Sequence, residues 1–259
     1  MRMSWKLGRA AGIDVFLHPT FLLILFVPDA VANLPLVIAL FGCVLLHEFG
    51  HALTARRFGI GTVNITLYPI GGVARLMRMP RAPGAELLIA LAGPAVNFAI
   101  AAGLYTVLGL GGSAILGDYA SFFLLQLMAM NLVLGGFNLI PAFPMDGGRV
   151  LRAVLSGWIG RGRATSFAAS VGRALALGFG IYSLLTFNLI QVALAGFIYY
   201  AAGVEEAGVL ADERRRRSPT PNEEDLWKAP PGYRWIESGQ GVWRLAPVTV
   251  ADWANRRWG

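Results

Sequence analysis

Long apolar runs alternate with short polar or basic segments along the first 204 residues of the chain. Six windows are apolar enough, and at about 20 residues long enough, to cross a bilayer as helices. The first is the weakest, because Asp29 and Asn33 shorten its apolar part. The pattern predicts an all-α polytopic membrane protein with about six transmembrane helices. The six windows cover residues 16–34, 35–57, 84–110, 119–140, 164–186 and 187–204.

Residues 60–78 do not follow the helical period. Val63, Ile65 and Leu67 alternate with polar residues before a proline at position 69. An alternation of period two predicts a strand, and the proline predicts a turn. Because an open strand edge cannot face lipid, we expect this short membrane-associated β segment to be covered by protein or to lie at the membrane surface.

The composition changes near residue 205, where charged residues and prolines replace the apolar runs. We expect residues 1–204 to form a transmembrane domain and residues 205–259 to form a cytoplasmic linker with a small Trp-rich tail. Within the tail, residues 233–236 and 242–245 are predicted to pair as two strands around a turn at 239–241.

Composition and charge agree with a protein embedded in lipid. Of the 259 residues, 56% are hydrophobic and 14% are charged, whereas soluble domains carry about a quarter charged residues. The net charge of +7 arises from basic residues that flank the apolar windows, so nucleic-acid binding is not expected. The single cysteine, Cys43, excludes an intrachain disulfide.

Basic residues fall on one side of the predicted spans. Arg and Lys precede the first window and follow the second, fourth and sixth, whereas the loops near 28–36, 111–118 and 186–190 contain none. Because cytoplasmic loops are enriched in these residues, both termini are predicted to be cytoplasmic. We expect a multi-pass protein of a prokaryotic plasma membrane.

His47, Glu48 and His51 form an HExxH pattern in the second window. On a helix, two histidines four residues apart project from one face, so both can bind one zinc ion with the Glu beside it. Ionisable groups inside a span are costly and usually functional, which favours a metal site over packing between helices. Arg56 and Arg57 mark the cytoplasmic end of the window, about 10 Å from the site.

A catalytic zinc takes three protein ligands, and two residues are candidates for the third. Asp146 follows the fourth window, where Pro141 and Pro144 end the helix and can turn a carboxylate back toward the bundle. His18 begins the first window on the same side of the membrane. Asp146 is preferred because its charge offsets part of the metal's charge, whereas His18 also fits a capping residue before Pro19.

Four motifs, in the order in which they occur, resemble those of the site-2 protease family of intramembrane zinc metalloproteases. They are HEFGH at 47–51, YPIGGVA at 68–74, GPAVN at 93–97 and NLIPAFPMDG at 138–147. No inserted PDZ-like domain or tandem CBS module is recognisable, so the regulation typical of those subtypes cannot be transferred.

The resemblance implies an endopeptidase with zinc as its cofactor. His47, His51 and Asp146 are the implied ligands, and Glu48 is the implied acid and base. The reaction would hydrolyse a peptide bond in or near the transmembrane segment of a single-pass membrane protein, such as an anti-sigma factor or a transcription-factor precursor.

Further residues are expected to handle the substrate. The resemblance suggests that Asn138 holds the substrate or stabilises the oxyanion. Asn97 is a weaker candidate for that role, because an Asn in a span can instead bond a neighbouring helix. The unwound substrate is predicted to dock on the β segment as an added strand. The docking positions are Thr66, Tyr68, Gly71 and Gly72.

Two other functions stay open at this stage. A zinc transporter would also place His and Asp in spans, but the outer half of the predicted bundle contains no series of ligands. A catalytically silent membrane scaffold would not need Glu48.

Overall fold

The computed structural model describes residues 4–26, 29–69, 71–78, 80, 82–217, 228–237 and 243–247. The chain divides into two compact units, Met1–Leu210 and Ala211–Gly259. The predicted boundary after residue 204 lies inside the last helix, α6 (Leu189–Arg217).

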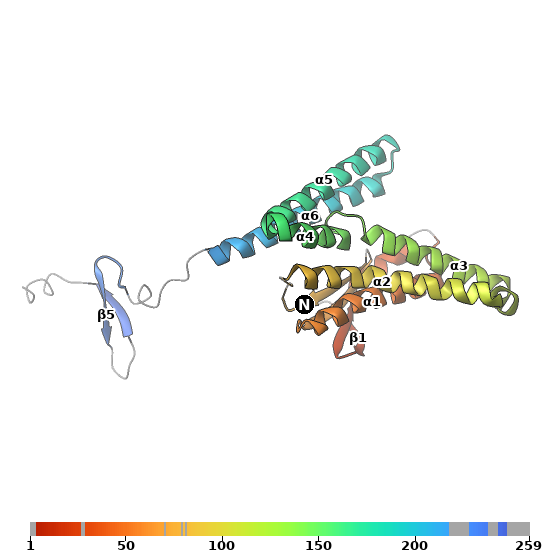
Figure 1. The fold of residues 1–259 in the computed structure, drawn as a ribbon, viewed down its shortest axis with the longest axis horizontal. Coiled ribbons are helices and arrows are strands. Elements are labelled where there is room, and N and C mark those ends of the chain that lie inside the picture. Colours follow the sequence, from red (N-terminus) through yellow and green to blue (C-terminus); the bar gives the residue numbers. More distant parts are fainter. Residues whose placement is uncertain are drawn as a thin grey trace, which may run out of the picture. The chain divides into compact units, whose positions relative to one another are not determined.

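Five helices of the described residues are long and apolar enough to cross a membrane. Three of them pack together, with α2 between α1 and α3, while α5 lies beside α6 (Figure 1). A further helix of 14 residues, α4, packs against α2 and α5 and is about 21 Å long, too short to cross. The helices that precede α6 are α1 (Leu34–Arg57), α2 (Pro83–Val107), α3 (Ser113–Asn138), α4 (Asp146–Ile159) and α5 (Arg161–Leu185), with a short π-helical turn, η2 (Leu108–Gly112), after α2.

Small side chains allow α5 and α6 to approach closely. Ala168 and Ala169 of α5 are fully buried and share one core cluster with Ala202 of α6. Without a hydrophobic driving force between helices in lipid, such contacts between small residues are a main source of helix association. The same cluster contains Phe143, which anchors the loop between α3 and α4 to this helix pair.

The expected first transmembrane helix, residues 16–34, is absent from the described residues, so there are five spanning helices rather than about six. Pro19–Phe26 instead form a 3-10 helix, η1, of eight residues. At about 2.0 Å per residue, η1 covers about 16 Å, far less than the bilayer core of about 30 Å. Asp29 and Asn33, which weakened this window in the sequence, lie in the turns before α1.

A strand and η1 together cover the depth that this helix was expected to cross. The Arg56 guanidinium donates a hydrogen bond to the Ala11 carbonyl (3.3 Å), so the turn before β2 (Ile13–Leu17) lies at the C-terminal end of α1. His18 N–H donates to the Leu67 carbonyl (3.0 Å), and η1 then leads to the start of α1. The chain therefore passes along α1 from one end to the other without forming a long helix.

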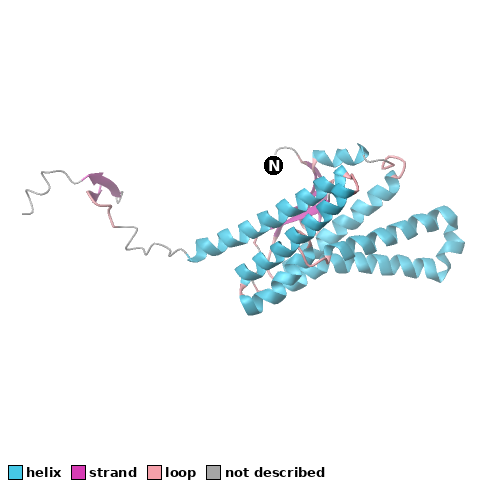
Figure 2. Cartoon of the chain, turned by 90° about the horizontal axis from the view of Figure 1, so that it is seen from above, coloured by secondary structure: helices cyan, strands magenta, loops and turns pink. Residues whose placement is uncertain are grey.

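The first unit contains one four-stranded sheet in the order β1-β2-β3-β4. The central pair, β2 and β3, is parallel, and the two outer pairings are antiparallel. The sheet (magenta in Figure 2) lies against α1, where Ile13 and Ile65 pack on Ala52. The β segment predicted between 60 and 78 is confirmed as a hairpin, whereas the two N-terminal strands were not predicted. The other strands are β1 (Trp5–Ala10), β3 (Thr62–Tyr68) and β4 (Gly71–Leu76).

The second unit contains an antiparallel pair, β5 (Tyr233–Glu237) and β6 (Trp243–Pro247). These strands overlap the two strands predicted for the tail. The turn predicted at 239–241 lies outside the described residues.

A buried ion-pair network joins α2, α4, α5 and α6. Arg152 of α4 is fully buried and bonds Glu86 of α2 (Nε to Oε1, 2.7 Å) and Glu205 of α6 (Nη1 to Oε1, 3.0 Å). Arg161 of α5 also pairs with Glu86 (2.9 Å). The Arg152 guanidinium in addition lies over the Phe143 ring, 4.9 Å from its centroid. The network therefore connects α4 both to the bundle and to the loop that precedes it.

Removing Arg152 leaves Glu86 and Glu205 without this partner. The variant Arg152→Leu is expected to lose about 3–5 kcal/mol of stability, because buried Glu86 keeps only Arg161 as a cationic partner and Glu205 loses its ion pair with Arg152. The double variant Arg152→Leu/Glu86→Leu is expected to lose less than Arg152→Leu alone. Thermal unfolding in detergent measures both, with Arg163→Leu at an exposed position of α5 as the control. An Arg152→Leu protein with the wild-type Tm would contradict this role.

Candidate metal centre

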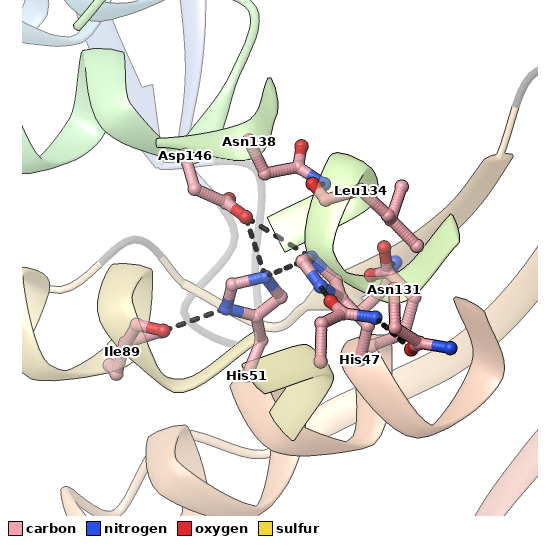
Figure 3. Close-up of polar contacts among 10 residues, drawn as sticks. His47, His51, Ile89, Asn131, Leu134, Asn138 and Asp146 are labelled. Carbon is pink, nitrogen blue, oxygen red and sulfur yellow. Dashed lines mark hydrogen bonds and ion pairs between the residues drawn. The ribbon is translucent and has the colours of Figure 1, made fainter. Parts of the chain in front are cut away.

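Three ligand atoms from two helices meet in a small triangle beside α1. His47 and His51 lie one turn apart on α1 and are almost fully buried, 4% and 6% exposed. Their Nε2 atoms are 3.1 Å apart. The Oδ2 atom of Asp146, the first residue of α4, is 3.1 Å from His47 Nε2 and 3.0 Å from His51 Nε2 (Figure 3). Among the described residues, these three form the group that could hold a metal ion.

The triangle fits a zinc ion in size and in chemistry. Tetrahedral zinc binds imidazole nitrogen at about 2.0–2.1 Å and carboxylate oxygen at about 2.0–2.2 Å, so its ligand atoms lie about 3.3 Å apart. The observed separations of 3.0–3.1 Å are within a few tenths of an ångström of that value. Two imidazoles and one carboxylate also leave a fourth position for water or substrate, which is typical of catalytic zinc sites.

The second ring nitrogen of each histidine also has a partner. His51 Nδ1 lies 2.7 Å from the Ile89 carbonyl of α2. Because a carbonyl can only accept, Nδ1 carries the proton and Nε2 keeps its lone pair for the metal. His47 Nδ1 lies 2.5 Å from Oδ1 of Asn97, also on α2. α2 therefore orients both rings.

Asp146 reaches the histidines because the chain folds back after α3. α3 ends at Asn138, and the segment 139–145 turns before α4 begins at Asp146. Gly147 permits this fold, since a Cβ there would lie 2.2 Å from the Ile140 carbonyl oxygen. The compact loop places the first carboxylate of α4 over the two imidazoles.

Glu48 lies between the two histidines in sequence, and β4 holds its side chain. Its Oε2 atom accepts a hydrogen bond from the Ala74 N–H (2.9 Å), and Gly72 packs against its side chain. The residue is only half-buried. The edge strand β4 therefore holds the carboxylate of the residue that follows His47 on α1.

The two asparagines singled out in the sequence have different surroundings. Asn138 is half-buried at the end of α3 beside Asp146 (Figure 3), and one of its amide N–H groups bonds the Leu134 carbonyl (3.1 Å). Asn97 is fully buried between His47 and Asn131, and its amide bonds both. Asn138 thus lies beside Asp146, and Asn97 lies against the far ring nitrogen of His47.

The remaining predicted residues lie apart from the triangle or on different strands. His18 is not in the metal-binding group, because its Nδ1 bonds the Thr20 hydroxyl (2.7 Å) and its ring stacks on Tyr68. Thr66 lies on β3, which pairs with β2 on one side and β4 on the other. Gly71 and Gly72 lie on β4, an edge strand.

Three groups at the centre were missed in the sequence. Asn131 was detectable in principle, as a polar side chain inside an apolar window. The Ile89 carbonyl and the Ala74 N–H were not, because every residue has a backbone carbonyl and almost every residue has an N–H.

Gly93 of α2 faces the metal-binding atoms directly. A Cβ at this position would lie 2.3 Å from His51 Nε2 and 2.6 Å from His47 Nε2. α2 can therefore pass behind the two imidazoles only because residue 93 has no side chain.

Gly93→Ala is expected to abolish zinc binding, because the added methyl group would displace both ring nitrogens. Metal content of the purified chain, measured by mass spectrometry, tests this. Gly103→Ala is the matched control on the same helix, where a Cβ would have nothing within 4 Å. Wild-type zinc content in the Gly93→Ala chain would contradict this geometry.

Comparisons with known proteins agree with the fold and the site. The family model described as peptidase family M50 matches residues 35–122 and 112–179. A zinc metalloprotease of Methanocaldococcus jannaschii is 42% identical over 212 residues, 79% of this chain and 61% of the relative. The Mycobacterium tuberculosis protein Rip3 is 34% identical over 238 residues, 80% of this chain and 59% of the relative. The chain thus spans about three fifths of the length of these curated relatives.

A solved structure supports the same assignment. The site-2 protease from Methanocaldococcus jannaschii superposes with a TM-score of 0.60 at 38% identity, covering 78% of this chain and 95% of that structure. Fold and spans together identify a multi-pass integral membrane protein. The chain belongs to peptidase family M50, the family of the site-2 proteases.

Proposed function

We propose that this chain is an intramembrane zinc endopeptidase that hydrolyses a peptide bond in or near the transmembrane segment of a single-pass membrane protein. The observation that carries the proposal is the triangle of His47, His51 and Asp146, whose two histidines lie together with Glu48 on a helix long enough to span. A transporter is less well supported, since the described residues contain no second metal-binding group along the bundle.

The residues of the site account for the proton transfers of hydrolysis. His47, His51 and Asp146 would hold zinc, which when bound lowers the pKa of water and polarises the scissile carbonyl. Glu48 takes the proton of the attacking water and then gives it to the leaving amine. The Ala74 N–H keeps the Glu48 carboxylate in place, and Asn138 holds the substrate or stabilises the oxyanion.

The site lies on the cytoplasmic side of the bilayer centre in the proposed orientation. His51 precedes Arg57 by six residues, which is about 9 Å along α1. The basic loops and the path of β2 and η1 along α1 are consistent with cytoplasmic termini. In this arrangement residues 1–204 form the protease domain, and residues 205–259 form a cytoplasmic linker and tail.

Glu48→Gln is expected to lower the rate of cleavage by at least about 10²-fold while zinc content stays at the wild-type level, because only the proton acceptor is removed. Quantitative mass spectrometry of membranes from cells carrying each form should show a single-pass protein that accumulates with Glu48→Gln. Asp118→Asn, at an exposed position of α3, is the control. Equal processing in both forms would favour the transporter or the silent scaffold.

We further propose that the unwound substrate adds to the sheet at the free edge of β4. Thr66 and Tyr68 lie on the inner strand β3, so the docking role is better assigned to Gly71, Gly72 and the residues that follow them. The edge of β4 runs past Glu48, which accepts a hydrogen bond from the Ala74 N–H. A strand paired there would bring its backbone next to the proposed base.

Cross-linking distinguishes the two edges of the sheet. A photoreactive residue at Val73 of β4 in a Glu48→Gln chain is expected to capture the protein that accumulates in the comparison above. The matched control is Leu7 on the opposite edge strand β1, because the two positions are similarly exposed, 54% and 58%. Equal capture from both positions, or capture only from Leu7, would refute docking on β4.

A further inference from the structure

A row of hydrogen bonds leads from His47 away from the metal triangle into α3. His47 Nδ1 bonds Asn97 Oδ1 (2.5 Å), and Asn97 Nδ2 bonds Asn131 Oδ1 (2.9 Å). Asn131 Nδ2 in turn bonds the Leu127 carbonyl one helical turn earlier (2.8 Å). Asn97 and Asn131 are both 0% exposed, so bulk solvent does not reach their amide groups.

The direction of every hydrogen bond in this row is set at its far end. The Leu127 carbonyl can only accept, so the Asn131 amide must turn its NH₂ toward it and its oxygen toward Asn97. Asn97 must then donate its NH₂ to Asn131 and present its own oxygen to His47. An oxygen there requires a proton on His47 Nδ1, which leaves the Nε2 lone pair directed at Asp146 and His51.

We propose that Asn131 is a positioning residue for the metal centre, acting through Asn97 to hold His47 in the tautomer that can bind zinc. This inference rests on the proposed zinc site. Reversing the Asn97 amide would turn its NH₂ group toward the His47 Nδ1–H, donor against donor, and its oxygen toward the Asn131 oxygen, acceptor against acceptor, in a fully buried site. The relay of Leu127, Asn131 and Asn97 thus disfavours the Nε2–H tautomer of His47, which could not bind zinc through Nε2.

The two histidines differ in how they are held. His51 is oriented by the Ile89 carbonyl, which no substitution can remove. His47 depends on two side chains from two other helices, and the hydrogen bonds of Asn131 go to Asn97 and to the Leu127 carbonyl. Asn131 therefore affects His47 through the direction of the hydrogen bonds. At this position the hydrogen-bonding groups of the side chain should matter more for zinc binding than its volume does.

Two substitutions at Asn131 separate the relay from simple packing. Asn131→Leu keeps the size of the side chain but removes the acceptor for Asn97. Asn131→Asp keeps an acceptor toward Asn97 and, in the neutral form, also a donor toward Leu127. If the side chain only fills space, Asn131→Leu and Asn131→Asp should bind zinc alike; if it sets hydrogen-bond direction, only Asn131→Asp should keep tight binding.

Zinc affinity of the purified full chain, measured by competition with a chelator, tests the relay. Asn131→Leu is expected to bind zinc about 10–100-fold more weakly than wild type, as when a metal-binding histidine loses its outer partner. Asn131→Asp should stay within a few-fold of wild type. Ser183→Ala is the control, because Ser183 is equally buried and also bonds a carbonyl one turn earlier, but on α5. Wild-type zinc affinity in Asn131→Leu would overturn the proposal. An equal loss of zinc affinity in Asn131→Leu and Asn131→Asp would also overturn it.

The tautomer itself can be read in zinc-free protein. The chain contains three histidines, so selective ¹⁵N labelling resolves their ring nitrogens by NMR at a pH that keeps imidazole neutral. Wild type should show Nδ1–H at both His47 and His51, and Asn131→Leu should lose this preference at His47 only. An Nε2–H signal for His47 in wild type would overturn the relay. A wild type that has the expected tautomers but binds no zinc would instead overturn the proposed function.

Discussion

The structure depends on one constraint, which is that every polar group inside the bilayer must find its partner within the protein. His47 and His51 bring four ring nitrogens into a spanning helix, and each has a defined neighbour. The inner two face Asp146, and the outer two face groups on α2. α2 meets this requirement with two residues. Gly93 lets the helix pass close to both imidazoles, and Asn97, one turn later, accepts a hydrogen bond from His47. A site that binds a cation in lipid is therefore built from three helices, not from one motif.

Positioning Asp146 requires contacts well outside the triangle. Its helix, α4, is too short to span and cannot be fixed by the membrane alone. Arg152, six residues further along α4, instead ties it to Glu86 and Glu205, and covers the Phe143 ring of the preceding loop. Such a buried network is costly to desolvate, and its value lies more in defining one arrangement than in adding stability. The metal centre and the ion-pair network thus meet on the same short helix, through Asp146 and Arg152.

The sheet connects the metal centre to a proposed route for the substrate. β4 is both the partner of Glu48 and an edge strand, so the same backbone can hold the base and receive an extended chain. An edge inside a membrane protein carries a cost unless it is covered, and α1 covers one part of this edge through Glu48. An unwound peptide at that edge would exchange its own helical hydrogen bonds for those of β4. In this proposal Ala74 links the docking edge to Glu48, the proposed proton acceptor.

The sequence by itself determined the membrane class, the five spanning helices of the described residues, the β3–β4 hairpin and the candidate ligand set, because these depend on local hydrophobic period and on rare polar residues in apolar windows. It did not determine the path of residues 13–26, since the end of β2 and the short 3-10 helix η1 together have the composition of a span and differ from one only in their partners. The roles of Asn131, Ile89 and Ala74 were decided by tertiary structure alone. Each acts through a hydrogen bond to a residue 26 to 38 positions away, and a linear pattern does not encode which distant groups will meet. The HExxH pattern thus predicts the chemistry. The packing of α2, α3 and β4 around it determines how the histidine ring nitrogens and the Glu48 carboxylate are held.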